Sequence, residues 1–206
     1  MLFDILVIIS VICFIPLAGR LANLFPSLAA CLLRWKENIN LQASLKMRTD
    51  RDILALALFV PFCLCIFRYR VYCPEFMQVL SENTRLWATL GIFSAYVLLR
   101  IACRIVFRMH NTSGTVYKQA TDSVRTFFII LVILLLIAIG ILSFFETPLS
   151  HVRTAMFWIS GFIYIMFLFR KTQIFLSSCN FFASFLYLCA LEILPTGVLI
   201  ASAVIF

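Results

Sequence analysis

The residue best suited to chemistry in this sequence is Glu192, which lies in the middle of a long apolar stretch. The stretch runs from Asn180 to Phe206 and would measure about 40 Å as a helix, enough to cross a bilayer. A carboxylate at mid-depth costs about 2.5 to 3.5 kcal/mol on insertion scales, so it is by default a functional hypothesis. Arg100 is its one basic candidate partner, at about 10 Å of predicted depth against about 18 Å for Glu192. A buried pair between the two is therefore feasible.

Three interpretations of Glu192 follow and stay open. The acid forms a structural ion pair or hydrogen bond that locks the helices together, or it relays protons or ions, or it contacts a partner subunit. Pro195 follows three residues later and frees a backbone carbonyl near Leu191. We group Tyr187 and Pro195 with Glu192 and Arg100 as an intramembrane polar site.

Two further arginines continue the line of Arg100 along its helix. Arg104 and Arg108 recur at intervals of four residues, so the three lie on one helix face. Long basic side chains near a helix end reach toward lipid phosphates. We interpret Arg104 and Arg108 as a basic stripe at the cytoplasmic face.

Composition indicates that these residues belong to a membrane protein. Hydrophobic residues make up 64% of the chain and charged residues 13%, whereas soluble domains carry about 25% charged residues. The mean hydropathy is +1.07. The net charge of +8 comes from Lys and Arg at the ends of apolar runs, which argues for lipid headgroups and against nucleic acid as the partner.

The apolar runs predict an all-α fold: a polytopic transmembrane helix bundle of five or six spans plus one interfacial amphipathic helix. That amphipathic helix follows Arg20, with Leu21, Leu24, Leu28 and Leu32 at helical spacing. The sequence from 37 to 52 is interpreted as a solvated loop. We expect one integral-membrane domain over residues 1–206. The predicted spans are 2–19, 53–67 (bent by Pro61), 86–107, 124–145, 154–169 and 180–206.

Charge asymmetry between the connections predicts the orientation. The first, third and fifth connections hold twelve Lys and Arg, and the second and fourth hold four. Basic residues are retained on the cytoplasmic side, so the odd-numbered connections are predicted to be cytoplasmic. The four on the other side are Arg68, Arg70, Arg85 and Arg153.

No motif for catalysis or cofactor binding is present. The sequence contains no HExxH, GxSxG, P-loop or dinucleotide fingerprint. Five of the eight cysteines fall inside predicted spans, and their spacing fits neither a disulfide framework nor a metal site. We therefore expect a protein that is not an enzyme and has no cofactor and no metal.

The run from Tyr187 to Pro195, YLCALEILP, resembles the C-terminal signature of a family of bacterial inner-membrane proteins. That family is the domain of unknown function called "four two seven one", which is typical of Bacteroidota. The resemblance implies the inner membrane of a Gram-negative bacterium and implies no activity. The predicted function is a non-enzymatic subunit or scaffold of a membrane assembly, with the lipid bilayer and membrane-protein subunits as partners. The alternative is a small proton- or ion-coupled transporter that uses Glu192.

Overall fold

The computed structural model describes residues 2–33, 44–106, 114–176 and 181–205. Every element in these ranges is helical, which confirms the prediction of an all-α bundle. Five helices are long and apolar enough to cross a membrane by length and composition: Leu2–Leu32, Glu82–Val106, Asp122–Phe144, Leu149–Leu176 and Ser184–Ala203. This is what a multi-pass membrane protein requires.

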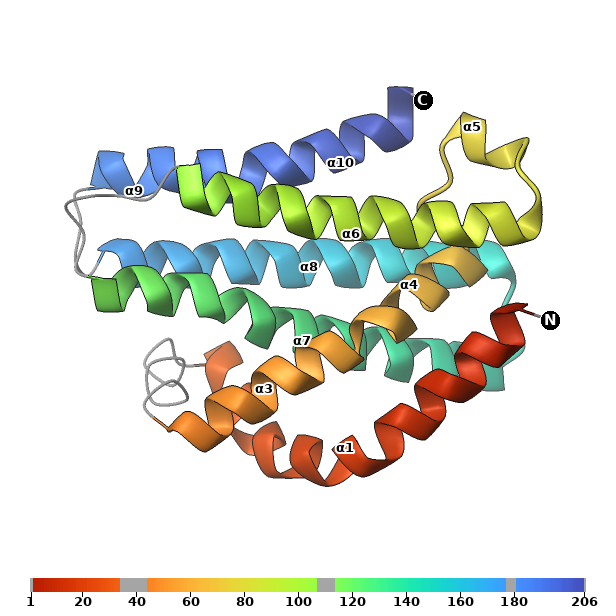
Figure 1. The fold of residues 1–206 in the computed structure, drawn as a ribbon, viewed down its shortest axis with the longest axis horizontal. Helices are drawn as coiled ribbons and strands as arrows, with labels where there is room; N and C mark the ends of the chain where they lie inside the picture. The colour runs from red at the N-terminus through yellow and green to blue at the C-terminus, as the bar shows by residue number, and fades with distance from the viewer. Residues whose placement is uncertain (1, 34–43, 107–113, 177–180, 206) are drawn as a thin grey trace.

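The central part of the bundle is built from three long helices. They are α6 (Glu82–Val106), α7 (Gly114–Phe144) and α8 (Leu149–Leu176). Figure 1 shows the three running along the long axis, and α7 and α8 are in extensive contact. The helices extend past the predicted spans because polar residues at their ends are also helical; α8 continues through Arg170 and Lys171 to Leu176.

The N-terminal helix differs from the prediction. A span over 2–19 and a separate interfacial helix were expected, but α1 (Leu2–Leu33) is one helix with Pro16 and Pro26 inside it. Each proline removes one backbone hydrogen bond and bends a helix without necessarily ending it, and Figure 1 shows α1 strongly curved. The face of Leu24 and Leu28 packs into the protein core instead of onto a membrane surface.

The second predicted span is a broken helix. It comprises α3 (Leu45–Ala57) and α4 (Phe59–Arg68), which are separated at Leu58. Pro61 cannot donate to the carbonyl of Ala57 four residues earlier, and its ring clashes with that carbonyl. The break therefore falls one turn before the proline. A short helix, α5 (Glu75–Gln78), follows at the end of the bundle where α6 begins.

The last predicted span, residues 180–206, is in three pieces. Helix α9 (Phe181–Leu188) leads into a π-helical turn, η1 (Cys189–Ile193), and then into α10 (Leu194–Ile205). In Figure 1, α10 departs from the line of α9 and runs beside α6. The change of direction occurs at the segment that contains Glu192.

Candidate functional site: a buried ion-pair centre

Glu192 is positioned by the π turn η1. The amide N–H of Leu194 donates to the carbonyl of Cys189, five residues earlier, in place of the α-helical bond to residue 190. Pro195 comes next and has no N–H, so it cannot restore the regular pattern at this point. One extra residue in a turn rotates the side chains that follow, and single π turns are frequent at functional sites. Here the turn points the Glu192 side chain into the bundle, where the residue is 2% exposed.

Two cations from two other helices meet the Glu192 carboxylate. Arg100 of α6 contacts Oε2 through a guanidinium nitrogen, and Lys171 of α8 contacts Oε1 through Nζ. Lys171 is as deeply buried as the acid. Each carboxylate oxygen therefore has its own positive partner. The three residues join α6, α8 and the final helical segment at one point.

Aromatic rings surround the cations. The ring of Phe167 lies 5.5 Å from the Arg100 guanidinium carbon and 5.6 Å from Lys171 Nζ. Phe175 lies 5.9 Å from the same Nζ and packs edge-on against Tyr187, with ring centroids 5.2 Å apart. Cations over aromatic faces gain about 0.5 to 2 kcal/mol each, more where water is excluded. The rings thus stabilise the positive charge that one carboxylate does not balance.

Tyrosine hydroxyls support the same segment from both neighbouring helices. Tyr164 of α8 donates to the backbone carbonyl of Glu192 at 3.1 Å. Tyr96 of α6 is hydrogen-bonded to Thr196 of α10, also at 3.1 Å. These bonds fix the irregular backbone. Without them, polar backbone groups that lack a regular α-helical partner would be poorly satisfied.

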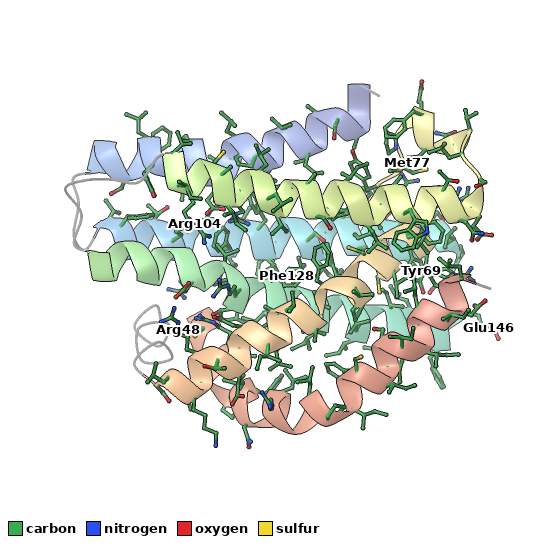
Figure 2. The ribbon with its side chains drawn as sticks, in the orientation of Figure 1. Arg48, Tyr69, Met77, Arg104, Phe128 and Glu146 are labelled. Atoms are coloured by element: carbon green, nitrogen blue, oxygen red, sulfur yellow. The ribbon has the colours of Figure 1, made fainter. Side chains whose placement is uncertain are left out.

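The structure brings together the four residues of the predicted polar site. Glu192 and Arg100 are in direct contact, Tyr187 is buried one layer away against Phe175, and Pro195 immediately follows the π turn. Arg104 lies one turn beyond Arg100 on α6 (Figure 2) and is half-buried. Arg108 lies outside the described residues.

Lys171 is the member of the site that the sequence did not reveal. It was assigned to the end of a span because it follows Arg170. In the structure it continues the buried face of α8, which also carries Ile163, Phe167 and Ile174. That spacing of three and four residues was the available signal, but it was hidden because apolar residues occupy most positions of α8 from 155 to 169, on every face of the helix.

A second group of charges ties α3 to α7. Asp52 accepts hydrogen bonds from Arg51, at 2.9 and 3.1 Å, and from Arg125 of α7, at 2.6 Å. Asp122 of α7 lies 3.7 Å from Arg51, whose side chain is 1% exposed. We call these four residues, together with Arg48, the Asp52 network. The loop predicted to be solvated therefore continues from residue 45 as a helix held against the protein.

The chemistry open to the Glu192 site is limited by its closure. A carboxylate with a cation on each oxygen presents no free face to a substrate. Among the described residues, no group of three His, Cys, Asp or Glu could hold a metal ion. The arrangement is that of a clamp between helices.

The family model described as "Domain of unknown function (DUF4271)" matches residues 3–202. No curated protein matches the chain, and no solved structure does.

Proposed function

Since the chain belongs to the DUF4271 family, whose function is unknown, we propose from its geometry that it is a non-enzymatic subunit or scaffold of a membrane assembly. The observation that carries the proposal is the closure of the Glu192 centre. The acid is 2% exposed and contacts Arg100 and Lys171 at once. A structural clamp needs this arrangement, whereas a relay needs a water path to the acid.

The closure of the Glu192 centre also supports a protein that works by binding other molecules at its outer surface. The buried acid holds α6, α8 and η1 together, which leaves the outer faces of the helices to meet lipid or other subunits. We propose the bacterial inner membrane as the location, with the connections α1–α3, α6–α7 and α8–α9 in the cytoplasm. The supporting argument is the excess of basic residues in those connections.

The alternative is a small proton- or ion-coupled transporter that uses Glu192. One observation favours it: a π turn beside a proline places an acid at mid-span, and irregular helices at mid-depth hold the ion sites of many transporters. The two functions differ in what they require of the acid. A relay needs a group that can exchange a proton, and a clamp needs only complementary contacts.

The experiment removes the acid without changing the net charge of the centre. Arg100, Lys171 and Glu192 sum to +1, and a Glu192→Gln/Lys171→Gln double variant also leaves +1, on Arg100. Lys171→Gln alone is the matched control because it keeps the acid. We expect the double variant to co-purify with the same partner subunits in mild detergent, at the same stoichiometry as the native protein.

Proton flux is measured in parallel, in vesicles that contain the purified protein and carry an imposed membrane potential. We expect no flux above that of protein-free vesicles. Flux that the native protein and Lys171→Gln show and the double variant lacks would establish the relay. A native protein that is isolated alone from its own membrane would contradict the assembly role.

A further inference from the structure

A polar cavity lies at the end of the bundle opposite the Asp52 network. Its volume is about 360 Å³, and it is lined by Arg70, Cys73, Gln78, Arg85 and Arg153. These residues come from three helices and the loop that carries α5. Figure 2 places the neighbouring residues Tyr69 and Met77 at this end. Pockets of this size are at the lower limit of those that hold small molecules.

The charge in this cavity is unbalanced. Its lining contains three arginines and no acid. Among the described residues, none of the three arginines forms a salt bridge; Arg85 and Arg153 instead lie over the rings of Phe67 and Phe157. The Nε of Arg85 is buried and has no hydrogen-bond acceptor. Buried donors are nearly always satisfied, so Arg85 is under-satisfied by the protein itself, and the cavity lining offers no anionic side chain to its three arginines.

The backbone at Arg70 supports a role for its side chain. The amide of Arg70 bonds to the carbonyl of Phe67 and that of Val71 to the carbonyl of Ile66, which is the pattern that closes a helix with a left-handed residue. Arg70 occupies that left-handed position, with φ of 50°. Glycine adopts this conformation without strain, whereas an arginine there strains the backbone. Such strained residues are often found at functional sites.

We propose that this cavity binds an oxyanion of the phosphate class, with the three guanidinium groups as its main ligands. Guanidinium groups donate paired hydrogen bonds that match phosphate oxygens, and Gln78 offers an amide donor beside them. The phosphate is supplied by a free anion or by the headgroup of an anionic lipid, since the cavity lies at the end of apolar helices.

Cys73 provides the measurement because its thiol lines the same cavity. In the purified protein, the rate of Cys73 alkylation by a maleimide is followed by mass spectrometry of the Cys73 peptide. We expect inorganic phosphate to slow the reaction several-fold, and chloride at equal ionic strength to leave it unchanged. In vesicles without added phosphate, protection by anionic phosphatidylglycerol and not by phosphatidylcholine identifies a lipid headgroup as the source.

The matched variants use two residues in the same backbone conformation. Arg70 and Glu146 both have φ of 50° and follow a helix by two residues, α4 and α7 respectively, but Glu146 does not line the cavity. Both Arg70→Gly and Glu146→Gly relieve the left-handed strain, and only the first removes a ligand. We expect Arg70→Gly to raise the half-protecting phosphate concentration about tenfold, as loss of one charge-assisted contact does.

In Glu146→Gly, phosphate should protect Cys73 at the same concentration as in the native protein. The proposal is overturned if neither phosphate nor anionic lipid slows alkylation, or if Arg70→Gly is protected as well as the native protein.

Discussion

At the scale of single residues, the two cations that contact Glu192 are not equivalent in what their loss leaves behind. Arg100 and Lys171 together outnumber the one acid. Removing Lys171 leaves a balanced pair of one acid and one base. Removing the charge of Glu192 leaves two buried cations that repel each other. The cost of a substitution therefore depends on the remaining balance, because an unpaired buried charge is the costly species.

This asymmetry gives a ranked prediction for stability. Glu192→Gln should lower the free energy of unfolding by about 3 to 5 kcal/mol, the usual cost of breaking a buried pair from one side. Lys171→Met should lower the free energy of unfolding by clearly less. Denaturant titration of the purified protein in detergent, followed by Trp fluorescence, measures both. Equal losses in the two variants would contradict this ranking, because Lys171 would then matter as much to the clamp as the acid does.

The residues of the site were only partly predictable. Glu192 was visible because it is an acid in an apolar stretch, and Arg100 because it lies too deep to reach the lipid phosphates. Lys171 was not, because a base beside Arg170 near the end of an apolar run has the ordinary pattern of a span terminus. Its burial depends on α8 extending to Leu176, which residue types alone did not indicate.

At the scale of helices, the Asp52 network determines how α3 sits against α7. Asp52 links Arg51 of its own helix to Arg125 of α7. Arg51 is almost fully enclosed, so its hydrogen bonds to Asp52 cannot be replaced by water without opening the interface. A nearby pair, Arg20 with Asp50 at 3.1 Å, has an exposed arginine where Asp52 has the buried Arg51, and serves as a comparison.

We expect Asp52→Asn to destabilise the protein by about 2 kcal/mol, since hydrogen bonds to charged groups contribute about 1.5 to 3 kcal/mol each. Asp50→Asn should cost about 1 kcal/mol or less, because its partner Arg20 is exposed and water can replace it. Hydrogen exchange of the α3 amides supplies the readout: faster exchange along α3 in Asp52→Asn, and nearly native exchange in Asp50→Asn. If both variants exchange alike, the network does not hold α3.

The helices were easier to predict than their ends and irregularities. Long apolar runs predicted the helix class and five or six spans, because a membrane-spanning length requires about twenty apolar residues. Five helices are long and apolar enough to span, and the second predicted span, 53–67, is not among them. The continuity of α1 was missed because Gly19 and Arg20 interrupt its hydropathy but not its hydrogen bonding. The π turn was also missed, since the hydrogen bond from Leu194 to Cys189 leaves no distinct pattern of residue types.

At the scale of the whole molecule, the helix ends separate into two groups. Figure 1 shows the N-terminus, α5 and the α7–α8 turn at one end of the bundle, and the starts of α3, α7 and α9 at the other. Of the twelve basic residues counted in the odd connections, Arg51 and Lys171 are buried in ion pairs. The remaining ten basic residues, against four at the opposite end, still predict that the end with the starts of α3, α7 and α9 faces the cytoplasm.

Cysteine labelling tests this orientation at two described positions, Ser44 before α3 and Glu75 in α5. A membrane-impermeant maleimide applied to sealed cells should label Glu75→Cys and spare Ser44→Cys until the membrane is permeabilised. The native protein gives the background from its own cysteines, Cys73 above all. If Ser44→Cys is labelled and Glu75→Cys is not, the protein has the opposite orientation.

The clamp at Glu192 also bears on how the protein is made. Synthesis runs from the N-terminus, so Arg100 and Lys171 enter the bilayer before their acid exists. Until the last helix arrives, two bases in the interior lack their counter-ion, and lone charges at that depth draw water and headgroups inward. Insertion of the helix that carries Glu192 then supplies the missing negative charge, and a chain truncated before residue 192 should keep two uncompensated cations between its helices.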